Sequence, residues 1–137
     1  MIELLDFNLR GGRDAPSAAA RVARVTERYL TKTAAHDIMA VVNEIVAWLG
    51  TREPIPSTLR LELSVTSTVV RVSVTAAPRR PPSPGPTTNR MVRQTLPVTA
   101  ALASRYGLEA SRRTRVWAEF DRCDEPVAAY TEPQYSS

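Results

Sequence analysis

The most regular pattern of apolar positions lies in DIMAVVNEIVAWLG, residues 37–50. Its apolar residues are three or four positions apart and therefore share one face of a helix. These residues are Ile38, Val41, Val42, Ile45 and Leu49. The stretch predicts an amphipathic helix that buries this face and ends at Gly50, which can act as a C-terminal cap because it lacks a Cβ. Glu44 and Trp48, four residues apart, lie beside the buried face and toward any cavity that borders the helix.

Alternating apolar and polar residues predict strands elsewhere in the chain. They span residues 5–9, 59–65, 70–74 and 116–120, with a hairpin turn at 66–68. Helical spacing predicts further helices over 18–29, after Pro16, and over 96–107, closed by Gly107. An apolar sheet face must be covered, so these elements predict an α+β fold with a helical layer on an antiparallel sheet.

A length of 137 residues suits one domain. We place this domain at residues 1–121, followed by a flexible tail at 122–137. The Pro-rich residues 76–91 interrupt regular structure, because proline removes backbone donors and stiffens the chain. We therefore expect an irregular loop there.

Composition narrows the possible functions. One cysteine and one histidine offer no cluster of soft ligands, so we expect no metal site. No apolar run has membrane-spanning length, and the N-terminus lacks the basic start of a signal peptide, which favours a cytoplasmic protein that contacts no membrane. The net charge of +4 permits an acidic partner. Binding to nucleic acid is the least favoured interpretation, because no basic run is interleaved with aromatic residues.

Four segments, in this order and spacing, resemble one known family. They are APSAAARVARVTERYL, AVVNEIVAWLG, VRVSVTAAP and LPVTAALASRYGLEASRRTRVWAEF. The family is the Bergerat-type (GHKL, histidine-kinase-like) ATPase domain of bacterial anti-sigma-factor serine kinases, especially the short actinobacterial forms. The resemblance covers about residues 2–120. It implies a two-layer α/β sandwich, with helices on one face of a mixed, mainly antiparallel sheet, and the loop 76–91 in place of an ATP lid.

The family's nucleotide-binding residues are largely replaced in this chain. The resemblance puts the N-box glutamate at Glu44 and the Mg²⁺-binding asparagine at Trp48, whose indole has an N–H donor and no oxygen ligand. The adenine-binding aspartate falls near Ala76, and a methyl group cannot accept a hydrogen bond from the base. These positions would form a vestigial nucleotide pocket, which we expect the Trp48 indole to fill.

The phosphate-binding glycines of the family correspond to Arg93, Gln94 and Thr95. Side chains there obstruct the close approach of phosphate to backbone N–H groups. Arg90 and Arg93 could still offer positive charge to an anion. Glu44 could survive as a vestigial catalytic base, although we favour a local cap or salt bridge for its carboxylate.

The resemblance and these losses together suggest a regulatory module for protein–protein interaction, a pseudokinase that needs no cofactor. Its partner would be a sigma factor, a STAS-type antagonist or a kinase-like homologue, and the family suggests a homodimer or heterodimer. The alternative is a weak serine/threonine-protein kinase that binds ATP and Mg²⁺ and uses Glu44 as its base. Such an enzyme would be slow, because Mg²⁺ normally stabilises the charge on the transferred phosphoryl group.

Overall fold

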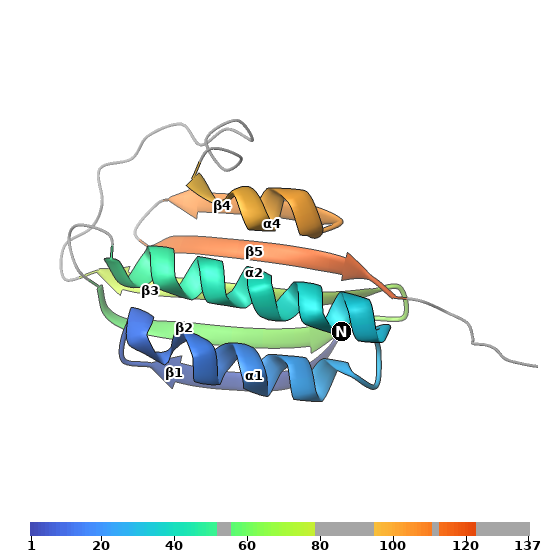
Figure 1. Ribbon diagram of the computed structural model, residues 1–137. Helices are drawn as coiled ribbons and strands as arrows, with labels where there is room; N and C mark the ends of the chain where they lie inside the picture. The colour runs from blue at the N-terminus through green and yellow to red at the C-terminus, as the bar shows by residue number, and fades with distance from the viewer. Residues whose placement is uncertain (52–55, 79–94, 111–112, 123–137) are drawn as a thin grey trace, which may run out of the picture.

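The computed structural model describes residues 1–51, 56–78, 95–110 and 113–122, and their elements form two layers (Figure 1). Helices α1, Ala15–Thr26, and α2, Lys32–Thr51, lie side by side across one face of a sheet. The short helix α4, Pro97–Leu102, lies on the same face beside α2. A 3-10 turn, Gly12–Asp14, leads into α1. The predicted α+β class is confirmed in the described residues.

The sheet has five strands in the order β1-β2-β3-β5-β4. They are β1 (Ile2–Leu9), β2 (Pro56–Val65), β3 (Val69–Pro78), β4 (Arg105–Ala110) and β5 (Thr114–Asp121). Every pairing between neighbouring strands is antiparallel. The prediction of a mixed sheet is therefore wrong for the described strands. Strands β1 and β2, β2 and β3, and β4 and β5 are sequence neighbours that pair directly. Strand β3 pairs with β5, also antiparallel, so β4 lies at the edge of the sheet.

The core lies between α2 and the sheet. The apolar face predicted for residues 37–50 is buried: Ile38, Val41, Val42 and Ile45 are 0% exposed and Leu49 is 1% exposed. These side chains share one buried cluster with the inward residues of the central strands, which include Leu61, Val72, Val74, Val116 and Phe120. Burying one such side chain contributes about 1.5–3 kcal/mol. The apolar residues that alternate with polar ones along β2, β3 and β5 thus form the sheet face that the helices cover.

Helix α2 extends beyond both predicted ends. It begins at Lys32 and continues through Gly50 to Thr51, so the predicted cap at Gly50 is wrong. The Thr51 hydroxyl donates a hydrogen bond to the carbonyl oxygen of Ala47, or of Trp48, each at 3.1 Å. A side chain of the last turn therefore binds carbonyl groups at the end of the helix.

The predicted helix over 96–107 is wrong in its second half. Helix α4 ends at Leu102, and Ala103 has extended backbone angles (φ −76°, ψ 145°). The chain then forms β4, in which Gly107 pairs with Trp117 of β5 instead of capping a helix. The backbone ladder with β5 satisfies donors and acceptors along a whole strand, which outweighs the helical spacing of a few apolar residues.

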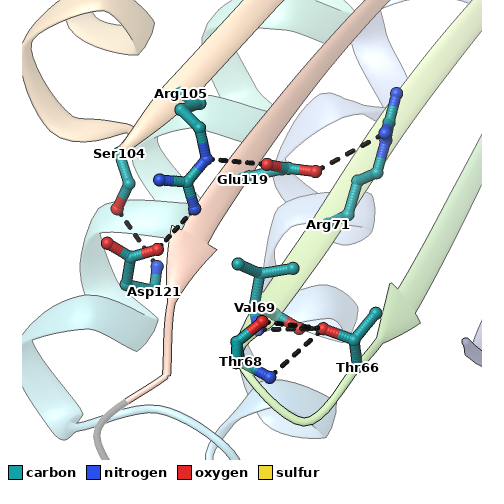
Figure 2. A network of polar contacts seen from close by, with 8 residues as sticks. All are labelled: Thr66, Thr68, Val69, Arg71, Ser104, Arg105, Glu119 and Asp121. Carbon is teal, nitrogen blue, oxygen red and sulfur yellow. Dashed lines mark hydrogen bonds and ion pairs between the residues drawn. The ribbon is translucent and has the colours of Figure 1, made fainter.

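The turn between β2 and β3 lies where the sequence predicts it. The Thr66 hydroxyl oxygen accepts hydrogen bonds from the N–H groups of Thr68 (3.2 Å) and Val69 (3.1 Å), as Figure 2 shows. The Thr66 N–H donates to the Val69 carbonyl at 2.9 Å. The predicted irregular loop 76–91 begins inside β3, which runs to Pro78, and its remainder lies outside the described residues. Of the predicted tail, the structure describes only Arg122.

Candidate functional site

Glu44 contacts the start of helix α4. Its Oε1 atom accepts hydrogen bonds from the Thr99 N–H at 2.7 Å and the Thr99 hydroxyl at 2.8 Å. Its Oε2 atom accepts one from the Val98 N–H at 2.9 Å. Both carboxylate oxygens therefore accept hydrogen bonds from another helix, where the sequence analysis favours a local cap or salt bridge.

The position of this carboxylate follows from helix electrostatics. The first N–H groups of a helix lack partners within the helix, and their dipoles attract negative charge. Leu96 occupies the N-cap position of α4 and has no side-chain oxygen to accept them. Pro97 at the next position has no N–H, so Val98 and Thr99 carry the first donors. Because Thr99 is 0% exposed, Glu44 supplies an acceptor where water has little access.

The other predicted pocket residues that the structure describes lie on different elements. Trp48 lies one turn beyond Glu44 on α2, half-buried, with its ring against the core. Ala76 lies near the end of β3, 5% exposed, and belongs to the same core cluster. Thr95 is exposed just before α4. Arg90 and Arg93 lie outside the described residues.

The structure thus brings Glu44 together with the segment that opens α4, close to Thr95. It reveals Val98 and Thr99 as polar partners that the sequence analysis missed. Pro97 signals a helix start, but nothing in a linear sequence indicates that the capping acid comes from another helix. The role of Trp48 as the filler of a nucleotide cavity stays a prediction.

The outer face of the sheet, which points away from the helices, carries a network of charges (Figure 2). Glu119 on β5 lies between Arg105, at 2.9 Å, and Arg71, at 3.5 Å. Arg105 also pairs with Asp121. The hydrogen bonds to Glu119 and Asp121 raise the pKa of Arg105 above its ordinary value. The strand register places Arg71, Glu119 and Arg105 in one row across the sheet, so opposite charges alternate along it.

Trp117 lies next to this row. Its indole ring receives the Arg71 guanidinium at 4.5 Å from the ring centroid. On its other flank is Gly107, where a Cβ would lie only 2.5 Å from the Trp117 Nε1 atom. The indole can lie across β4 only because that position carries no side chain. On the outer face, Trp117 therefore contacts both neighbouring strands, β3 through Arg71 and β4 through Gly107.

One acidic cluster lies at the β1 edge of the outer face. Glu3, Asp6 and Glu62 each place a carboxylate oxygen within 4.8 Å of the others. Arg60 already binds Asp6 through two hydrogen bonds, of 2.9 and 2.6 Å. This bidentate contact lowers the pKa of Asp6 below its ordinary value of 3.8. The hydrogen bonds from Arg60 are the main cause, and the positive charge of Arg60 adds to it. The cluster is thus partly neutralised by the protein's own arginine.

This ion pair makes a testable prediction. Replacing Arg60 with Gln should return the pKa of the Asp6 carboxyl toward 3.8, as measured by NMR titration of the side-chain carbon. The folded-state pKa is depressed, so the pair stabilises the fold above the unfolded pKa and this contribution is lost as pH falls through the folded pKa. Arg24→Gln, an exposed arginine on α1, serves as the control and should not shift Asp6. An unchanged Asp6 titration in Arg60→Gln would contradict the assigned cause.

Comparison with known proteins adds no family assignment. No protein-family model matches the chain, and no curated protein matches it. The resemblance to anti-sigma-factor kinases therefore stays a prediction based on the chain's own residues. Within the described residues, every helix is too short or too polar to cross a membrane.

Proposed function

We propose that the chain is a regulatory protein-binding module with the scaffold of an anti-sigma-factor kinase and without its nucleotide chemistry. The observation that carries this proposal is the position of Glu44. The carboxylate that the resemblance assigns to catalysis is bound through both oxygens to the start of α4. The element order, with α1 and α2 between β1 and the β2–β3 hairpin and α4 before β5, is compatible with such a scaffold.

The occupied carboxylate argues against phosphate binding at this place. A phosphate at the start of a helix would use the same N–H donors that Val98 and Thr99 give to Glu44. Two negative groups competing for these donors would also repel each other. The resemblance also puts Trp48 at the Mg²⁺-binding position and Ala76 at the adenine-binding position. These replacements and the bound carboxylate together support a protein that acts by binding other proteins through its surface.

The partner is then a protein of the same regulatory class. We propose a sigma factor, a STAS-type antagonist or a kinase-like homologue, bound in the cytoplasm, with a homodimer or heterodimer as the form suggested by the family. Binding would occlude the partner and would require no phosphoryl transfer. A complex formed by this mechanism should assemble without nucleotide.

The proposal is tested by isothermal titration of the full chain with Mg-ATP. We expect no binding heat beyond that of diluting Mg-ATP into buffer. The residues that the family uses to bind Mg²⁺, adenine and phosphate are all replaced in this chain. In size-exclusion chromatography without nucleotide, the same protein should form a complex with one of the named partner classes from its host. Micromolar affinity for Mg-ATP would overturn the proposal. Transfer of radiolabelled phosphate to a partner, abolished by Glu44→Gln, would favour the kinase instead.

A further inference from the structure

A groove of about 540 Å³ runs between α1 and α2 and opens to solvent. Small side chains form much of its wall: Ala20 and Ala23 from α1 and Ala35 from α2, with Met39 at one side. Charged groups border it: Arg24 on α1, Glu27 just after α1 and Lys32 on α2, with His36 of α2 beside them. The groove is therefore apolar along its walls and carries more basic than acidic groups at its border.

The chain leaves the described domain near this groove. Strand β5 ends on the side of the molecule where α1 connects to α2 (Figure 1). Arg122, the last described residue, places its guanidinium 5.3 Å from the centroid of the Tyr29 ring, in the α1–α2 connection. It also donates a hydrogen bond to the Thr66 carbonyl at 2.6 Å. The following residues thus start from a fixed point beside the end of the helical layer.

The sequence of residues 123–137 complements the groove in charge and size. It contains Asp124, Glu125 and Glu132 and no lysine, arginine or histidine. Between these acids lies the apolar run Val127–Tyr130, with two alanines at its centre. Acids on both sides of a small apolar run match basic groups at the border of a groove with alanine walls.

Length and tethering also favour this segment over a free partner. At about 3.3 Å per extended residue, residues 123–126 span up to about 13 Å, comparable to the roughly 10–12 Å diameter of a helix. The tether is therefore about as long as one helix of the layer is wide. A short tether gives an effective concentration in the millimolar range, so even weak contacts of a tethered segment outcompete those of a dilute free partner.

We infer that residues 123–137 bind the α1–α2 groove of their own chain, with Val127–Tyr130 against the alanine walls and the acids near Arg24 and Lys32. The inference rests on the groove, the exit point and the charges, and is independent of the function proposed above.

Paramagnetic NMR on the full chain tests this inference. A nitroxide is attached at Thr131→Cys in a Cys123→Ser background, which leaves one thiol for labelling. We expect selective loss of signal intensity at Ala23 and Met39, while Ser73 on the outer sheet face keeps its intensity. Equal intensities with the active and the reduced label would overturn the inference.

Two further samples separate the possible occupants. Arg24→Glu combined with Lys32→Glu should restore the groove signals, whereas Arg28→Glu, an exposed arginine outside the groove lining, should not. Unchanged broadening in the double variant would contradict the charge match. In a mixture of isotope-labelled chains without nitroxide and unlabelled chains with it, the groove signals should stay intact. Their loss would show that the segment binds a second copy, which would overturn binding within one chain.

Discussion

Replacing Gly107 with Ala should lower the free energy of unfolding by about 2–3 kcal/mol. The new Cβ would lie 2.5 Å from the Trp117 Nε1 atom and 2.6 and 2.7 Å from two carbons of the same ring, closer than real Cβ contacts. The indole must therefore leave its place across β4, and its cation–π contact with Arg71 goes with it. Urea unfolding followed by circular dichroism measures the loss as a lower midpoint at unchanged slope.

Gly11 provides the matched control for this substitution. A Cβ at Gly11 meets no atom within 4 Å, and its backbone lies outside the left-handed region that favours glycine. Gly11→Ala should therefore leave stability unchanged or raise it by up to about 1 kcal/mol, because alanine restricts the unfolded chain. In a Trp117→Ala background, Gly107→Ala should lose most of its cost. An equal cost in both backgrounds would show that the clash with the indole is not the cause.

Elements with a strong local pattern are predictable from the sequence. The buried face of α2 and the alternation of β2 and β3 are visible in a linear sequence because each repeats over several turns or residue pairs. Strand β4 was missed because the spacing of Ala100, Ala103 and Tyr106 also suits a helix. The alternation of Tyr106 and Leu108 with charged residues and glycine was a signal for a strand, but it is short. Pairing with β5 decided the outcome, and the pattern within residues 105–110 alone does not show that pairing.

The candidate site was predictable only in part. Helical spacing placed Glu44 beside the buried face of α2, where it can reach a neighbouring element. The identity of that element depends on how α4 packs against α2, more than fifty positions later in the chain. The contact between Trp117 and Gly107 is similar, because only the strand register brings them opposite each other. Local pattern thus identifies which residues are available for contacts, while tertiary packing selects their partners.

The capping role of Glu44 leads to the second large expected effect. Glu44→Ala should lower the free energy of unfolding by about 2–4 kcal/mol, because it removes hydrogen bonds to a charged acceptor and leaves donors of the buried Thr99 without a partner. Glu44→Gln keeps one oxygen acceptor but turns an NH₂ group toward an N–H donor. Its cost should be intermediate, roughly 1–2 kcal/mol. Urea unfolding of the parent protein, Glu44→Gln and Glu44→Ala measures the three free energies of unfolding, which should fall in that order.

Asn43→Ala is the control, since Asn43 precedes Glu44 on the same helix and is exposed. Its effect should stay within about 0.5 kcal/mol of the parent protein. If Glu44→Ala were as stable as Asn43→Ala, the carboxylate would contribute little at the start of α4 and would be available for chemistry. That outcome would remove the observation on which the proposed loss of nucleotide chemistry depends. If Glu44→Ala lost stability, Asn43→Ala did not, and Mg-ATP titrations of both gave the same result as the parent protein, the carboxylate would have a structural role.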